Sequence, residues 1–418
     1  MMDNFIDEIN SLMIYKGIKN NKIVTLLKSI FVKQDNFEDF AEMLSELTRM
    51  AEKSGYSGNL FKSYIIHLML KDENVFTLHC ENGHNLENTS LYNLANKDIE
   101  TIKNIAELDL MELPDAKYLS TAIDEITNYV PVNKCDTDYV GMRDGFDIND
   151  VISYHTKYGC GDVSVFKAFR YDDKKQELVG VTHPDPITFD KLIGYEAQTK
   201  TLIDNTLAFV NGYSSNNVLL VGARGTGKSS SVKALVNEFF EDGLRLVEIT
   251  KEQIAILPDI LKLLRPRGRK FIIFIDDLSF DENEIQYKYM KSLLEGSSEG
   301  KPENVVFYAT SNRRHLIQEK WSDRADGNSE AAEIHRSDSM NEKLSLADRF
   351  GITITYPKPT PKEYINIVAG IAKHKGIEVD AEELRMKAMQ WELQQKGMSG
   401  RTAKQFVNHL EWSINNNK

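Results

Sequence analysis

The chain has 418 residues and a formal net charge of −12, with 51 Lys and Arg residues against 63 Asp and Glu residues. This acidic balance argues against a protein that binds nucleic acid over its whole surface, because neutralising phosphates requires clustered basic side chains. Hydrophobic residues make up 41% of the chain, too many for a disordered protein, and the three scattered cysteines argue against a disulfide framework or a four-cysteine zinc site.

The N-terminal sequence predicts neither export nor membrane insertion. Residues Met1 to Glu8 contain no basic segment followed by an apolar stretch, which a secretory signal would require. The most apolar short run is Phe271–Ile275, whereas a membrane-spanning helix needs about 20 apolar residues. We therefore expect a cytoplasmic protein with no membrane partner.

Residues 1–185 form the first predicted domain. Apolar residues recur at helical spacing through most of it, with the segment Leu60–Lys71 as a strong helix candidate. Glycines and short β-like runs, including Val163–Arg170, mark a β-containing segment near 131–185. The two prolines in His183-Pro-Asp-Pro186 cannot continue a helix, so the domain boundary is placed there.

Residues 186–356 alternate strand and helix signals. Four apolar runs are predicted as strands: Val218–Val221, Arg245–Thr250, Phe271–Ile275 and Val305–Ala309. A helix is expected from Lys228 to about Phe240. Continuous apolar strands separated by helices predict a parallel sheet that is covered on both faces. Residues 357–418 return to a helical pattern. The predicted fold is therefore α/β: a parallel-sheet core, a helical C-terminal lid and a mostly helical N-terminal domain.

A phosphate-binding loop follows the first of these strands. Gly222-Ala-Arg-Gly-Thr-Gly-Lys228-Ser229 matches the pattern G-x-x-x-x-G-K-[ST] between a strand and a helix. Glycines let successive backbone N–H groups turn towards an anion, and the helix N-terminus adds a positive dipole end. We expect Lys228 to reach the β- and γ-phosphates. The predicted nucleotide-binding residues are Gly222, Ala223, Arg224, Gly225, Thr226, Gly227, Lys228, Ser229 and Ser230.

Two carboxylates follow the strand Phe271–Ile275. In a parallel sheet the carboxyl ends of the strands line the ligand crevice, so Asp276 and Asp277 are expected beside the phosphate loop. Asp276 and the Ser229 hydroxyl are predicted to hold Mg²⁺. Asp277 is predicted to orient or deprotonate the attacking water.

With these motifs the segment 187–418 resembles the AAA+ ATPase superfamily. Thr310-Ser-Asn312 is similar to the sensor-1 segment of that superfamily, and Leu346-Ala-Asp-Arg349-Phe-Gly351 is similar to its arginine-finger segment. Ser399-Gly-Arg401 is similar to sensor 2. Leu192-Ile193-Gly-Tyr195 is similar to the lead-in segment that contacts adenine. The resemblance implies ATP and Mg²⁺ as cofactors. It also implies catalytic roles for Asp277, Asn312, Arg349 and Arg401, with Arg349 supplied in trans by a second copy of the chain.

Several further segments resemble an uncharacterised bacterial family of standalone AAA+ ATP-binding proteins with a domain of unknown function, including Glu333-Ile-His-Arg-Ser337. Two features depart from most AAA+ proteins. Asp277 stands where a longer Glu is usual, which places fast hydrolysis in question, and Lys251-Glu-Gln-Ile-Ala-Ile-Leu257 replaces an aromatic pore loop. A threading unfoldase is therefore disfavoured.

Three functions remain open. We favour an ATPase that remodels a macromolecular partner, with protein preferred over DNA as that partner. The second is a loader or initiator acting on DNA, and the third is a nucleotide-dependent binding switch with little turnover. The basic run Arg265-Pro-Arg-Gly-Arg-Lys270 is interpreted as a solvated loop, with a nucleic-acid contact as the alternative.

Overall fold

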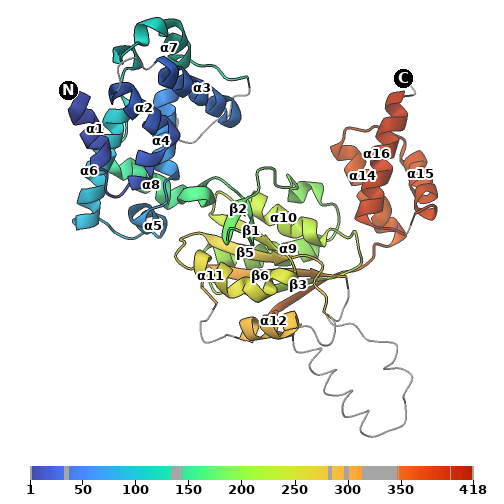
Figure 1. Ribbon diagram of the computed structural model, residues 1–418. Coiled ribbons are helices and arrows are strands. Elements are labelled where there is room, and N and C mark those ends of the chain that lie inside the picture. Colours follow the sequence, from blue (N-terminus) through green and yellow to red (C-terminus); the bar gives the residue numbers. More distant parts are fainter. Residues whose placement is uncertain are drawn as a thin grey trace. The chain divides into compact units, whose positions relative to one another are not determined.

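The computed structural model describes residues 2–32, 37–132, 142, 145–280, 285–295, 301–312, 346, 348–395 and 397–416 (Figure 1). The predicted family motif at 333–337 and most of the segment before Arg349 lie outside these residues. The chain divides into two compact units, Met1–Val165 and Phe166–Lys418. None of the helices in the described part of the chain combines the length and the apolar character needed to cross a membrane.

The first unit is helical, as predicted. Its α-helices are α1 (Met2–Ser11), α2 (Lys22–Val32), α3 (Phe37–Ser54), α4 (Leu60–Lys71), α5 (Val75–Glu81), α6 (Ser90–Ala106), α7 (Ser120–Thr127) and α8 (Ile148–Tyr158). Helix α4 has the predicted bounds, and the Asn59 side chain caps it by accepting a hydrogen bond from the Lys62 N–H. Short 3₁₀ helices occupy Lys16–Asn20, Leu110–Glu112, Ala116–Tyr118 and Gly161–Ser164.

One buried carboxylate ties the start of this unit to its longer helices. Asp98 of α6 is 3% exposed. Its Oδ2 accepts hydrogen bonds from the backbone N–H groups of Met13, Ile14 and Tyr15 at 2.9, 2.7 and 3.0 Å. A buried charge needs such partners, because desolvation would otherwise penalise it heavily. Asp98 thus fixes the turn after α1 against α6.

The second unit is built on a seven-stranded sheet with the order β2-β1-β4-β5-β6-β3-β7 (Figure 1). The strands are β1 (Ala168–Asp172), β2 (Glu177–Gly180), β3 (Val218–Gly222), β4 (Leu244–Ile249), β5 (Lys270–Ile275), β6 (Val305–Ser311) and β7 (Ile352–Tyr356). All pairs are parallel except the hairpin of β1 and β2. The predicted parallel-sheet core is confirmed.

The sheet is buried as its apolar strands predict. Helices α9 (Glu196–Val210) and α10 (Lys228–Glu238) pack on one face through Leu202, Phe209 and Leu235. Helix α11 (Leu257–Leu264) buries Leu257, Ile260, Leu261 and Leu264, and helix α12 spans Ile285–Glu295. Because β3, β5 and β6 are parallel neighbours, their carboxyl ends meet at one edge.

Three strands differ from the sequence prediction. The hairpin β1–β2 belongs to the sheet, because Ala168–Arg170 pairs in parallel with Leu246–Glu248 of β4. The first unit therefore ends about twenty residues before the predicted boundary at 185. Strand β7 was not predicted; it pairs with β3 at the opposite edge.

The predicted C-terminal lid consists of α14 (Pro361–His374), α15 (Ala381–Leu393) and α16 (Gly400–Asn416). Thr360 and Glu363 form a capping box at the start of α14, with Pro361 in the first turn. The three helices share a small core of their own, to which Tyr364, Val368, Ala403 and Val407 contribute. The lid is thus a helical subdomain that follows β7 directly.

The basic run 265–270 is only in part the solvated loop that the sequence predicts, because Arg265 is exposed while two other arginines are buried. Arg267 and Arg269 are only 6% and 7% exposed. The amide group of Asn304 donates hydrogen bonds to the carbonyls of Leu264, Arg267 and Arg269, which folds the run against the amino end of β6. Burial also removes both arginines from any surface that nucleic acid could contact.

Candidate functional site

The loop after β3 adopts a conformation that suits a phosphate group. Gly222, Gly225 and Gly227 have φ angles of 145°, 75° and 94°, in the region that side-chain-bearing residues rarely adopt. At Gly222 an added Cβ would lie 2.0 Å from the Tyr356 carbonyl oxygen. Gly227 caps α10, so the helix N-terminus opens directly onto the loop. The residues from Gly222 to Ser230 therefore form one continuous turn into the helix.

Lys228 lies inside this turn and is 6% exposed. Its Nζ donates hydrogen bonds to the carbonyls of Gly222 and Ala223 at 2.9 and 2.7 Å and to Asn312 Oδ1 at 3.0 Å. Burial lowers the pKa of its ammonium group, the carboxylates of Asp276 and Asp277 raise it, and the Arg224 guanidinium lowers it. The ammonium group is therefore held at the point where a bound phosphate would meet the loop.

Asp276 lies beside Ser229, as predicted. The Ser229 hydroxyl donates a hydrogen bond of 2.6 Å to Asp276 Oδ1. These are hard oxygen donors, which Mg²⁺ prefers. In the described part of the chain no group of three or more His, Cys, Asp or Glu residues is placed to hold a metal. A Mg²⁺ ion at Ser229 and Asp276 would accordingly complete its coordination with water and phosphate oxygens, as this ion usually does.

Asp277 has a left-handed backbone, with a φ of 55°. Asp and Asn are several-fold enriched in this conformation relative to longer side chains. This offers a physical reason for a second Asp where Glu is usual. The Asp277 carboxylate accepts a 2.5 Å hydrogen bond from Asn312 Nδ2 and lies 4.0 Å from the exposed Arg224 guanidinium.

Asn312, after β6, connects the basic and acidic sides of the site. Its Oδ1 accepts from Lys228 while its Nδ2 donates to Asp277. One amide group therefore sets the distance between the ammonium group and the second carboxylate. The amide orientation follows from these two contacts, since an ammonium can only donate and a carboxylate can only accept.

Thr310 is a site residue that sequence reasoning did not single out. Its hydroxyl donates to Asp276 Oδ1 at 2.5 Å and accepts from the Asp277 N–H at 2.9 Å. Thr310 lies within the segment Thr310-Ser-Asn312 that resembles sensor 1, but only the pairing register of β5 and β6 places its hydroxyl beside the two carboxylates. The signal available in the sequence was a hydroxyl residue directly after a predicted strand and two residues before Asn312.

The lid meets the phosphate loop through its last helix. The backbone N–H of Arg401 donates to the Gly225 carbonyl at 3.2 Å. A Cβ added at Gly225 would lie 3.1 Å from Arg401 Cβ and from Ser399 Oγ. The Arg401 side chain is exposed, on the second residue of α16. Arg401 is thus adjacent to the loop through its main chain, and its catalytic role stays a prediction.

The lead-in segment also reaches the lid. Ile193 packs against the lid core, where a Cβ on Gly370 would lie 2.8 to 3.0 Å from its side-chain atoms. Tyr195 donates a 2.7 Å hydrogen bond to the Pro357 carbonyl, and its ring lies 5.1 Å from that of Tyr356. Ile193 is therefore placed between the core and the lid, next to the strand that leads into the lid.

Arg349 occupies the turn before β7. Its side chain is exposed, and its backbone N–H donates to the Leu346 carbonyl at 3.2 Å. An exposed position is compatible with a residue that serves a neighbouring molecule. Its role in trans stays a prediction.

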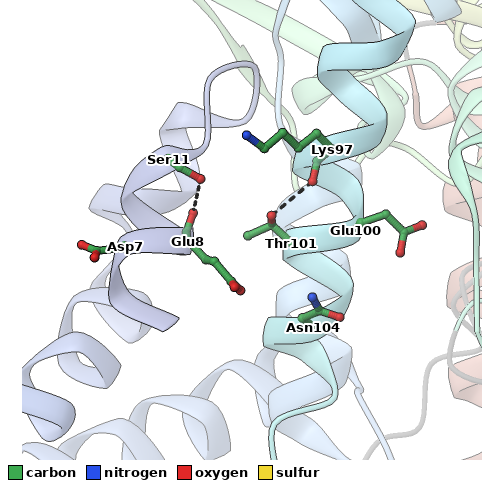
Figure 2. Close-up of a pocket in the computed structure, with 7 residues that line it drawn as sticks. All are labelled: Asp7, Glu8, Ser11, Lys97, Glu100, Thr101 and Asn104. Atoms are coloured by element: carbon green, nitrogen blue, oxygen red, sulfur yellow. Dashed lines mark hydrogen bonds between the residues drawn. The ribbon is translucent and has the colours of Figure 1, made fainter. Parts of the chain in front are cut away.

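The first unit has a hollow of about 560 Å³ between α1 and α6 (Figure 2). Asp7, Glu8 and Glu100 line it together with a single cation, Lys97. Its two hydroxyls are engaged locally, with Ser11 bonded to the Glu8 carbonyl and Thr101 to the Lys97 carbonyl. Three carboxylates against one ammonium group would repel a phosphate. This hollow is therefore no rival to the loop at 222–230 as a nucleotide site.

Comparisons with known proteins extend this description. Among solved structures, a mutant RuvB from Thermotoga maritima is 20% identical over 53% of this chain and 64% of its own, with a TM-score of 0.38. RuvB from the same organism, a Holliday junction branch migration motor, is 17% identical over 54% of this chain and 72% of its own, with a TM-score of 0.32. This chain thus spans less than two thirds of the first of these RuvB chains. None of the curated proteins matches it.

The family model described as "Protein of unknown function (DUF815)" matches residues 164–413, more than half of the chain. The match begins just before β1, so it includes the hairpin that the structure assigns to the second unit. It confirms the predicted resemblance to an uncharacterised family with a domain of unknown function. The chain belongs to the DUF815 family.

Proposed function

We propose that this protein binds ATP with Mg²⁺ and hydrolyses it to ADP and phosphate. One observation carries the proposal: Lys228, Ser229, Asp276, Asp277 and Asn312 converge where β3, β5 and β6 end, and hydrogen bonds connect them. A phosphate loop alone would indicate binding. The addition of a carboxylate and an amide beyond the expected metal site favours hydrolysis.

Each residue has a distinct part in this proposal. The loop amides from Gly222 to Ser230 hold the phosphates, and Lys228 exchanges its carbonyl partners for β- and γ-phosphate oxygens. Ser229 and Asp276 hold Mg²⁺, which when bound neutralises charge on the phosphates. Ile193 contacts the adenine ring.

The remaining residues act on the attacking water and on the charge that develops. Asp277 and Asn312 orient the water, whose oxygen attacks the γ-phosphorus as the bond to the bridging oxygen of ADP breaks, and Asp277 accepts its proton. Arg401 in cis and Arg349 from a second copy stabilise charge on the transferred phosphoryl group. The active species is therefore a homo-oligomer.

The contact between Asn312 and Asp277 favours a second candidate, a nucleotide-dependent switch with little turnover. A carboxylate that accepts a 2.5 Å hydrogen bond from an amide has less freedom to take a proton from water. Asp277 would then report which nucleotide is bound. Turnover measurements separate the two candidates.

ATPase rates measured against protein concentration test these assignments. We expect the rate per molecule to rise with concentration and to fall about 100-fold or more in both Asp277→Asn and Arg349→Ala. Asp259→Asn and Arg385→Ala serve as controls, since both residues are exposed and lie on α11 and α15.

Three results would contradict parts of the proposal. Equal rates in wild type and Asp277→Asn remove Asp277 from catalysis. A rate per molecule that is independent of concentration and unchanged in Arg349→Ala removes the contribution in trans. Wild-type protein that takes up no ATP refutes the proposed function altogether.

We further propose that the energy is used to remodel a macromolecular partner, with protein favoured over DNA. The net charge of −12 and the burial of Arg267 and Arg269 both disfavour a DNA surface. Pull-down with Asp277→Asn held in ATP identifies the partner. DNA binding with a steep negative salt dependence would instead support a loader that acts on DNA.

A further inference from the structure

Thr310 occupies a position from which a single hydroxyl reaches both acidic residues. It is 1% exposed and lies near the end of β6. A hydroxyl has one donor hydrogen and two acceptor lone pairs. Thr310 directs the hydrogen to Asp276 Oδ1 at 2.5 Å and offers a lone pair to the Asp277 N–H at 2.9 Å.

The same residue also holds the turn that follows β5. The Thr310 carbonyl accepts a hydrogen bond from the Leu278 N–H at 2.7 Å. Two successive amides, those of Asp277 and Leu278, are therefore bound to Thr310. Between them lies the left-handed backbone of Asp277, a conformation that costs free energy and persists only where surrounding contacts impose it.

At Asp276 two hydroxyls share one carboxylate oxygen. Ser229 donates to Oδ1 at 2.6 Å and Thr310 donates to the same atom at 2.5 Å. No hydrogen bond from the described residues reaches Oδ2. The two donors thus fix the carboxylate in one rotation and leave its second oxygen available to a metal ion or to water bound to it.

We propose that Thr310 is a positioning residue of the metal site: its hydroxyl orients Asp276 for Mg²⁺ and imposes the backbone from which Asp277 projects. This inference rests on the proposed function and names a residue through which both carboxylates act. Partners of this kind, hydrogen-bonded to metal ligands, commonly change metal affinity or activity by about 10- to 100-fold when they are removed.

The test compares Thr310→Val, which keeps the shape and removes the hydroxyl, with Thr310→Ser, which restores it. Binding of a fluorescent ATP analogue is measured in EDTA and over a Mg²⁺ titration, and Mn²⁺ binding in the presence of nucleotide is followed by electron paramagnetic resonance. We expect Thr310→Val to need about 10- to 100-fold more metal. Its affinity without metal should stay within about threefold of wild type, and Thr310→Ser should bind metal close to the wild-type level.

Thr206→Val is the matched control. Thr206 is a fully buried threonine of α9 whose hydroxyl bonds to the Leu202 carbonyl and to the Tyr308 hydroxyl, away from the carboxylates. We expect it to lower the thermal midpoint and leave the metal requirement unchanged. If Thr310→Val does not fold, Thr310→Ala provides the same comparison with Thr310→Ser.

The outcomes separate this inference from the proposed function. Metal-dependent ATP binding in wild type with an unchanged metal requirement in Thr310→Val overturns the role of Thr310 and leaves the proposed function standing. A loss in Thr310→Ser equal to that in Thr310→Val also overturns it. If the wild type binds no nucleotide, both proposals fail together.

Discussion

Replacing Lys228 with methionine tests the nucleotide site most directly, because the side chain keeps its approximate length and loses only its charge and donors. In the structure, Nζ donates hydrogen bonds to the carbonyls of Gly222 and Ala223 and to Asn312 Oδ1. On binding, these would be exchanged for bonds to phosphate oxygens, each worth about 1.5–3 kcal/mol as contacts between charged groups.

The exchange sets the expected magnitude. Since the carbonyl contacts are given up, we expect a net loss of about 2–4 kcal/mol of binding free energy in Lys228→Met. This corresponds to ATP affinity weaker by about 30- to 700-fold. Folding stability should change little, because the variant removes a buried ammonium group while leaving three acceptors without their donor.

The assay is a titration of a fluorescent ATP analogue, paired with thermal denaturation. Lys233→Met is the control, since Lys233 lies on the same helix α10 and pairs with Glu248 at 2.9 Å. An affinity of Lys228→Met within threefold of wild type, at an unchanged thermal midpoint, would refute the assignment of the loop as the phosphate site.

Two further predictions concern the first unit. Asp98→Ala should lower the free energy of unfolding by about 3–5 kcal/mol, because three backbone N–H groups lose a buried charged acceptor. Urea unfolding followed by circular dichroism measures this loss, and Glu100→Ala, at an exposed position on the same helix, is the control. A loss below about 1 kcal/mol would contradict the prediction. Burial, followed by the charge of Lys71, lowers the pKa of His67 to about 4. Between about pH 4 and 6.5 the His67 ring is therefore protonated in the unfolded chain and neutral in the folded chain. The free energy of unfolding should accordingly fall by about 2 kcal/mol from about pH 7 to 5. The fall should be smaller in His67→Gln, which lacks the titrating group. A His67 ring signal that titrates in NMR near its ordinary value would contradict this reasoning.

Local patterns were sufficient to predict which residues the structure brings together at the centre of the candidate site. The phosphate loop from Gly222 to Ser229 is contiguous in sequence, and its glycines, lysine and serine each have a chemical reason to stand there. Asp276 followed from one further rule, that the carboxyl ends of parallel strands meet. Helix α4 was predicted for a similar reason, since its apolar residues repeat at helical spacing over its whole length.

What the sequence could not supply depends on pairing between distant segments. The hairpin β1–β2 was placed in the first domain because nothing in residues 168–180 indicates that β4 is their neighbour. Strand β7, Ile-Thr-Ile-Thr-Tyr, alternates apolar and polar residues and lies at the sheet edge, so it lacks the continuous apolar run of the central strands. The burial of Arg267 likewise depends on Asn304, more than thirty residues away.

The role of Thr310 escaped prediction on the same grounds. A threonine at the end of a strand is common, and its meaning depends on the register that sets Ala309 opposite Ile275. The same register brings the Thr310 hydroxyl to the N–H of Asp277, whose backbone is left-handed. When the strand register is unknown, the sequence shows Asp277 only as an aspartate at a position where the longer glutamate is usual.

The hydrogen bond between Arg401 and Gly225 has a consequence for how the proposed nucleotide site would communicate with the lid. Because this hydrogen bond joins a carbonyl to a backbone amide, we expect the lid to follow a shift of the phosphate loop whichever side chain stands at 401, whereas the guanidinium would add charge and hydrogen-bond donors towards a bound phosphate. A variant such as Arg401→Ala should therefore separate mechanical coupling from electrostatic sensing, by retaining the first and losing the second.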